Sequence, residues 1–217
     1  MITLYGCYRS RATRPLWLLA ETGTPFTHVP VIQAYRLDRP KATDAPLNTA
    51  SPDFLAVAPI GQIPVLVEGD LTLTESLAIT MYLARVHGGA LGPASDAESA
   101  LMEQWSLFAA TAVEGPALDI RMVIDKGVQG AEAEAFIAIS AEKLRRPLAH
   151  LARALTGAWL VGGRFTVADL NVAECVRYAA AHPTLLDEFP AVKAWLARCQ
   201  ARPAFAAMWA AREAEPV

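Results

Sequence analysis

Residue types that could bind and orient a small molecule occur in three segments near the N-terminus. The loop after the first apolar segment carries Cys7, a thiol, and Ser10, whose hydroxyl could donate a hydrogen bond to a thiolate. Farther along, Pro64 opens an apolar segment, a position where a proline can begin a strand. A cis Ile63–Pro64 bond would turn the Ile63 N–H and C=O outward to pair with an extended peptide, whereas a trans, strand-initiating proline is the alternative.

The third segment is Thr74-Glu75-Ser76, which opens a predicted helix. Thr74 is a natural N-cap, and the free N–H groups at a helix start attract anions. Ser76 adds a hydroxyl donor, and Glu75 is a carboxylate that could hold an ammonium group. A carboxylate receptor beside an ammonium receptor is what the α-amino acid end of a ligand requires. If Thr74 is only a cap, however, the segment has no ligand.

The elements that must position these groups change in kind near residue 90. Before that point, strands alternate with helices, and the turn Glu68-Gly69-Asp70 predicts an antiparallel hairpin. We expect strands at residues 2–5, 26–31, 63–67 and 71–73, and helices at 11–21, 53–57 and 75–86. After residue 96 we expect helices at 96–126 (with a possible break at Gly115–Pro116), 131–155, 166–182, 190–200 and 203–212. The predicted division is therefore a domain at 1–87, a linker at 88–95 and an all-helical domain at 96–217.

The composition excludes several classes of protein. The chain has 217 residues, of which 53% are hydrophobic and 19% charged, so a large core is available and general disorder is excluded. A net charge of -3 gives no basic stripe for nucleic acid. No apolar run is long enough for a membrane span, and Arg9, Arg11 and Arg14 interrupt the place where a signal peptide would be apolar. We therefore expect a cytoplasmic protein with no nucleic-acid or membrane partner.

The cysteines and histidines give no sign of a metal site. Three cysteines and four histidines are scattered along the chain, and their spacing matches neither a zinc pattern nor a disulfide framework. We therefore expect no metal cofactor.

Taken together and in this order, the motifs resemble the cytosolic glutathione transferases. The resemblance rests on residues 16–21 (LWLLAE), 58–66 (APIGQIPVL), 73–79 (LTESLAI) and 163–170 (GRFTVADL), and it extends over nearly the whole chain. In the last segment, Thr166 and Asp169 stand three residues apart, as in a capping box with Asp in place of Glu. The resemblance implies an α/β thioredoxin-like N-terminal domain joined to an all-α helical-bundle C-terminal domain, with glutathione as co-substrate.

The same resemblance implies roles for several residues. Ile63 would bind the cysteinyl part of glutathione through its backbone, beside a cis Pro64, with help from Gln62. Glu75 and Ser76 would hold the γ-glutamyl end. The glycine carboxylate would meet a basic or polar residue of the irregular loop, for which the candidates are Arg36, Arg39 and Lys41.

Which group stabilises the glutathione thiolate remains open at this point. Ser10 lies at the expected helix start, like the serine of serine-type classes. Tyr5 ends the first strand, as in tyrosine-type classes, and Cys7-x-x-Ser10 is similar to glutaredoxin-like thiol chemistry. A guanidinium from Arg9 or Arg11 could also stabilise a thiolate.

The resemblance further implies a homodimer that transfers glutathione to a small hydrophobic electrophile. The helix from residue 96 would face the first domain and line the acceptor pocket with Trp105 and Phe108, although aromatic residues three apart on a helix also suit a core. Two other functions remain: a glutathione-dependent disulfide reductase that uses Cys7, and a non-catalytic binding or scaffold protein with the same fold.

Overall fold

The computed structural model describes residues 1–216, which form two compact units. The first unit holds residues 1–89 together with the C-terminal segment that starts at Pro203, and the second holds residues 90–202. The chain passes from one unit to the other between Gly89 and Ala90, inside the predicted linker. The segment after Pro203 was predicted as part of the helical domain, and the structure groups it with the first unit instead.

The first unit is built on a mixed sheet with the strand order β2-β1-β3-β4. β1 runs parallel to β2 and antiparallel to β3, and β3 and β4 form the predicted hairpin. Gly69 has a φ of 59° in the hairpin turn, a conformation that glycine adopts readily. The strands are β1 (Ile2–Gly6), β2 (Phe26–Pro30), β3 (Val65–Glu68) and β4 (Leu71–Leu73).

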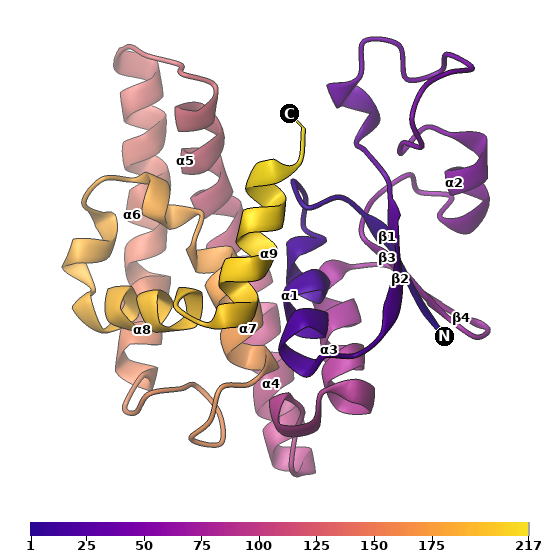
Figure 1. Cartoon of the computed structure of the whole chain (residues 1–217). Helices are drawn as coiled ribbons and strands as arrows, with labels where there is room; N and C mark the ends of the chain where they lie inside the picture. The colour runs from indigo at the N-terminus through magenta and orange to yellow at the C-terminus, as the bar shows by residue number, and fades with distance from the viewer. Residues whose placement is uncertain (217) are drawn as a thin grey trace. The chain divides into compact units, whose positions relative to one another are not determined.

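Helices cover both faces of this sheet, as Figure 1 shows: α1 (Thr13–Thr22) and α3 (Ser76–His87) lie on one face and α2 (Pro52–Val57) on the other. Side chains alternate between the faces along β1, so Leu4 and its cross-strand partner Leu66 are fully buried on one side. Tyr5 points to the other side, where its ring lies 6.3 Å from that of Phe54 on α2. The loop after β1 and the start of α3 are both attached to this sheet, so the two apolar layers fix their positions within the first unit.

The last helix, α9 (Pro203–Ala214), packs against α1. The Phe205 ring lies 4.9 Å from the buried Trp17 ring in an edge-to-face arrangement, and Met208 is buried as well. This packing is the physical reason why the C-terminal segment belongs to the first unit. It also brings the end of the chain to the loop after β1.

The second unit is helical. It contains α4 (Asp96–Phe108), a π-helical segment (Ala109–Glu114), α5 (Gly115–Asp125), α6 (Ala131–Ala154), α7 (Val167–Val176) and α8 (Pro190–Gln200). α5 and α6 lie side by side, and α7 packs against α4 and α8 (Figure 1). The possible break at Gly115–Pro116 coincides with an element boundary: the π-helical segment ends at Glu114 and α5 begins at Gly115. Pro116 lies in the first turn of α5, where a missing N–H is tolerated.

α7 is the buried centre of the second unit. All of its residues are buried, and the predicted capping box is confirmed: Thr166 N–H donates to the Asp169 carboxylate at 3.1 Å. The prediction that this helix extends to residue 182 is wrong, since α7 ends at Val176 and a short 3₁₀ turn (Ala179–Ala181) follows. No helix among residues 1–216 is both long enough and apolar enough to cross a membrane.

Candidate active site

The first unit brings the loop after β1, the Ile63–Pro64 segment and the start of α3 together. Gly6 ends β1 against the other two chain segments: a Cβ there would lie 2.8 Å from Ala12 Cβ and 3.7 Å from Pro64. A side chain at position 6 would therefore push the loop away from Pro64. The Ile63–Pro64 bond is cis, as the resemblance implies, and within the described chain no hydrogen bond of the Ile63 backbone is found.

Ser10 forms a turn ahead of α1. Its hydroxyl donates to the Cys7 carbonyl at 2.6 Å and accepts from the Ala12 N–H at 3.0 Å. The helix itself begins at Thr13, so Ser10 is not its N-cap. To donate to a thiolate, the hydroxyl must rotate away from the Cys7 carbonyl, which costs one neutral hydrogen bond and gives one to a charged group.

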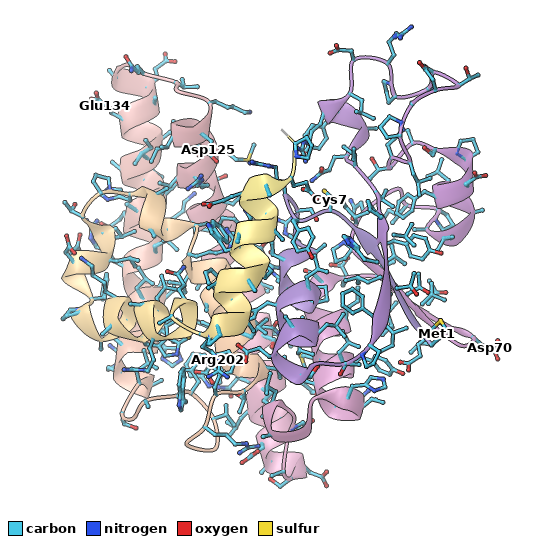
Figure 2. All side chains as sticks on the ribbon, viewed as in Figure 1. Met1, Cys7, Asp70, Asp125, Glu134 and Arg202 are labelled. Carbon is cyan, nitrogen blue, oxygen red and sulfur yellow. The ribbon has the colours of Figure 1, made fainter. Side chains whose placement is uncertain are left out.

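Cys7 is buried and 1% exposed. Its thiol donates to Gln33 Oε1 at 3.3 Å, and Figure 2 shows it in the loop after β1. Burial, and after it the nearby Glu215 carboxylate, raise the pKa of the Cys7 thiol. A thiol that stays protonated and is enclosed is a poor nucleophile.

The end of the chain binds this loop through Glu215. Its carboxylate accepts from the backbone N–H of Tyr8 at 2.8 Å and of Arg9 at 2.7 Å. The Arg9 guanidinium donates in turn to the Glu215 and Glu213 carbonyl oxygens. Burial and the Glu215 charge raise the pKa of the Tyr8 phenol. The loop is therefore tied to the C-terminal segment by hydrogen bonds that involve charged groups.

The other candidates in this region have different surroundings. Tyr5 packs on the sheet face that α2 covers, away from the side of Leu4. Arg9 is engaged with the C-terminal segment, and Arg11 is exposed. Two loop residues, Tyr8 and Ser10, combine a partly exposed side chain with a hydroxyl proton, and of these Ser10 lies next to the start of α1.

The start of α3 has an unusual backbone. The predicted N-cap Thr74 is wrong by one residue: α3 begins at Ser76, and Glu75 takes the cap position. Glu75 has φ 63° and ψ 107°, a conformation that is strained for a residue with a side chain. Its side chain is exposed, whereas Ser76 is buried. Strain of this kind is found at ligand-binding positions, which fits a receptor for the γ-glutamyl end.

Ser76 is linked to α1 by a buried arginine. Arg14 Nη1 donates to Ser76 Oγ at 2.9 Å, and Arg14 is 1% exposed. Arg14 is not among the predicted site residues, although its position four residues before the buried Leu18 places it on the apolar face of α1. Glu215 is not among them either, and the sequence carries no local signal for it.

The remaining candidates of the first unit are Gln62 and three basic residues of the irregular loop. Gln62 is exposed beside Ile63, and Arg36 donates to Gln33 Oε1 at 3.1 Å and to the Pro216 carbonyl at 2.8 Å. Arg36 Nη1 also lies 3.9 Å from Cys7 Sγ and so reaches the loop after β1, whereas Arg39 and Lys41 are exposed. No group of three or more His, Cys, Asp or Glu side chains in residues 1–216 is arranged to hold a metal ion.

Trp105 and Phe108 belong to the second unit. Trp105 is 6% exposed, and its ring lies 5.4 Å from that of Phe108 and 5.4 Å from that of His150. Phe108 also contacts His150, with ring centres 5.3 Å apart. Trp105 is therefore largely a packing residue of α4 and α6, and Phe108 is the more exposed of the two.

The first unit is thioredoxin-like and has a cis-proline loop beside a helix start, and the second unit is helical. These features place the chain in the class of glutathione transferases. Residues 1–85 match the family described as "Glutathione S-transferase, N-terminal domain", and residues 112–203 match "Glutathione S-transferase, C-terminal domain". The chain belongs to the glutathione S-transferase family.

Individual relatives agree with this assignment. Glutathione S-transferase 3 of Zea mays is 35% identical over 220 residues, which cover 94% of this chain and 91% of that protein. The crystal structure of glutathione transferase F7 from Populus trichocarpa has a TM-score of 0.80 at 28% identity, covering 98% of this chain and 99% of that one. A theta class enzyme of Xanthomonas axonopodis pv. citri, solved with glutathione bound, has a TM-score of 0.73 at 31% identity and covers 94% of each chain. This chain is thus an enzyme that conjugates glutathione.

Proposed function

We propose that Ser10 activates the thiol of glutathione, which the first unit holds in an extended conformation. Ile63 pairs with the cysteinyl backbone, and Glu75 and Ser76 bind the ammonium and carboxylate of the γ-glutamyl end. The observation that carries this proposal is the convergence at one place of a partly exposed hydroxyl, the Ile63 backbone beside a cis proline, and a strained helix start.

Groups of this chain can provide the free energy needed to lower the pKa of the glutathione thiol. An ordinary thiol has a pKa of about 8.5, and lowering it by about two units requires about 2.7 kcal/mol. A hydrogen bond to a charged group contributes about 1.5–3 kcal/mol, and a helix start adds up to about 1 kcal/mol. The Ser10 hydroxyl and the nearby start of α1 therefore suffice, and the mechanism needs no metal and no covalent enzyme intermediate.

The properties of Cys7 do not favour the alternative function, a disulfide reductase. Such an enzyme needs an accessible thiolate, whereas Cys7 is buried, hydrogen-bonded to Gln33 and has a raised pKa. In this proposal Cys7 takes no part in catalysis and is a packing residue of the loop after β1.

The acceptor in this proposal is a small hydrophobic electrophile, and the candidates for contacting it are Phe108 and Trp105, of which Phe108 is the more exposed. The partly buried aromatic cluster on α4 supports this choice. We also propose that the enzyme is a cytoplasmic homodimer. Exposed apolar side chains on the second unit, such as Leu101 and Leu107, support an interface between copies.

The experiment compares conjugation rates of matched variants with an aryl halide. Ser10→Ala should lower kcat/KM at pH 7 by about ten- to a hundredfold, because the thiolate loses one charge-assisted hydrogen bond. Cys7→Ser and Tyr5→Phe are the controls and should stay within about twofold of the wild type. A Ser10→Ala enzyme with normal activity, or a Cys7→Ser enzyme without activity, contradicts the proposed role of Ser10.

A further inference from the structure

Arg14 is a buried cation, and one of its partners is a proposed ligand-binding hydroxyl. Its side chain extends from α1, is 1% exposed, and donates from Nη1 to Ser76 Oγ at 2.9 Å. A charge is expensive to bury, so a guanidinium in this position needs good hydrogen bonds. Among them, the contact with Ser76 reaches the first residue of α3.

The direction of this hydrogen bond determines what Ser76 can do. A guanidinium only donates, so the Ser76 oxygen must be the acceptor. The hydroxyl has a single proton, and within the described residues no acceptor for that proton is found. The proton therefore remains available to a ligand, and a positively charged donor on the oxygen makes the O–H a stronger donor.

We propose that Arg14 is a positioning residue for glutathione: it holds the Ser76 hydroxyl so that its proton points to the α-carboxylate of the γ-glutamyl residue. This inference rests on the proposed role of Ser76 as a ligand for that carboxylate. Arg14 lies behind Ser76 and does not touch glutathione in this arrangement. Its positive charge also favours an anion at the start of α3, where the backbone N–H groups point.

A purely structural role would give a different result. If Arg14 only connects α1 to α3, its loss would lower the stability of the free protein and affect all ligands alike. If Arg14 orients the hydroxyl, its loss would act on one group of one ligand. The two roles are separated by removing the carboxylate from the ligand as well as the side chain from the protein.

The test is a double-mutant cycle on glutathione affinity, measured by calorimetry on folded protein. Ser76→Ala should weaken binding by about ten- to a hundredfold, and Arg14→Met by about tenfold. In the double variant, Arg14→Met should add no more than about a twofold loss, because the hydroxyl that it positions is gone. Saturating kcat should change little while KM rises, since thiol activation occurs at Ser10.

The matched controls use a second ligand and a second residue. γ-Aminobutyryl-cysteinyl-glycine, which lacks the γ-glutamyl carboxylate, should bind the wild type and Arg14→Met within about twofold of each other. Leu18→Ala removes a fully buried side chain of the same helix and should lower stability without changing glutathione affinity by more than about twofold. Arg14→Lys, which keeps the charge but not the planar donor geometry, should fall between the wild type and Arg14→Met.

The outcomes separate this inference from the proposed function. If Ser76→Ala leaves glutathione affinity unchanged, the role of Ser76 itself is wrong. If Ser76→Ala weakens binding but the Arg14 effect is additive, or persists with the decarboxylated ligand, only the role of Arg14 is overturned. If no Arg14 variant folds, a crystal structure of the wild type with glutathione decides: Ser76 Oγ must contact both Arg14 Nη1 and the carboxylate, and a structure with either contact absent overturns the inference.

Discussion

Glu75 combines an exposed carboxylate with a backbone conformation that residues with side chains rarely adopt. In the described chain it is the only non-glycine residue with a positive φ, and the value is 63°. Such a conformation costs about 1–3 kcal/mol and persists only where the surrounding structure holds it. Glycine at this position would be free of that strain but would lose the carboxylate.

We therefore predict that Glu75→Gly affects stability and binding in opposite directions. The variant should be as stable as the wild type or more stable, by up to about 2 kcal/mol, because released strain exceeds the extra entropy of glycine in the unfolded chain. Glutathione affinity should fall by at least about tenfold, since the ammonium loses its counter-charge. Urea unfolding and calorimetry measure the two quantities. A Glu75→Gly protein that is clearly less stable would show that the side chain has a structural role.

At the residue scale, what the sequence could predict depended on the distance along the chain. The Thr166–Asp169 capping box was predictable because both partners lie within one helical turn. The Glu215 contacts with Tyr8 and Arg9 span more than 200 residues, with separations of 207 and 206, and depend on how α9 packs. Even the local prediction of Thr74 as a cap was off by one residue, because Glu75 adopts the strained conformation that ends the loop.

The start of α7 shows how one carboxylate can organise a whole element. Asp169 is fully buried and accepts from the Thr166 N–H, from the Leu160 N–H at 3.0 Å and from Trp195 Nε1 at 2.9 Å. It thereby joins α7, the loop before it and α8. Burial raises the pKa of Asp169, although these hydrogen bonds oppose the shift.

We predict that Asp169→Asn lowers the free energy of unfolding by about 1–3 kcal/mol, because an amide NH₂ cannot accept from the Thr166 N–H. The effect should depend on pH with a defined sign. Asp169 has a higher pKa in the folded than in the unfolded state, so its contribution is largest below the unfolded pKa of about 3.9 and declines as the pH rises through the folded value. Urea titrations of both proteins from pH 3 upward should show a difference that shrinks with rising pH. A difference that grows with pH contradicts the raised pKa.

The elements themselves were largely predictable, and the exceptions have physical causes. Alternating and helical spacing of apolar residues located the strands and helices of the first unit, because each element buries one face. The π-helical segment between α4 and α5 was not predictable, because the Gly115–Pro116 pair predicts a helix break and not a change of helix type. A proline in the first turn of a helix removes no hydrogen bond that the helix needs. Only the structure shows that Pro116 occupies this position in α5.

At the scale of the whole molecule, the first unit is completed by the last helix. The sequence predicted a helix at residues 203–212 but not its partner, because the apolar residues of a helix show that it packs and not what it packs against. The contact between Trp17 and Phe205 decides this in favour of α1. As a result, the Glu215 carboxylate reaches the loop that carries Ser10.

The central claim is that Ser10 lowers the pKa of the bound glutathione thiol. The most direct measurement is a pH titration of the ultraviolet thiolate absorbance in the glutathione complex of the intact protein. We predict a midpoint about two units below the ordinary thiol value of about 8.5, and a rise of about 1–2 units in Ser10→Ala, which corresponds to one hydrogen bond to a charged group. The claim is contradicted if the bound thiol titrates like free glutathione, or if wild type and Ser10→Ala share the same lowered midpoint.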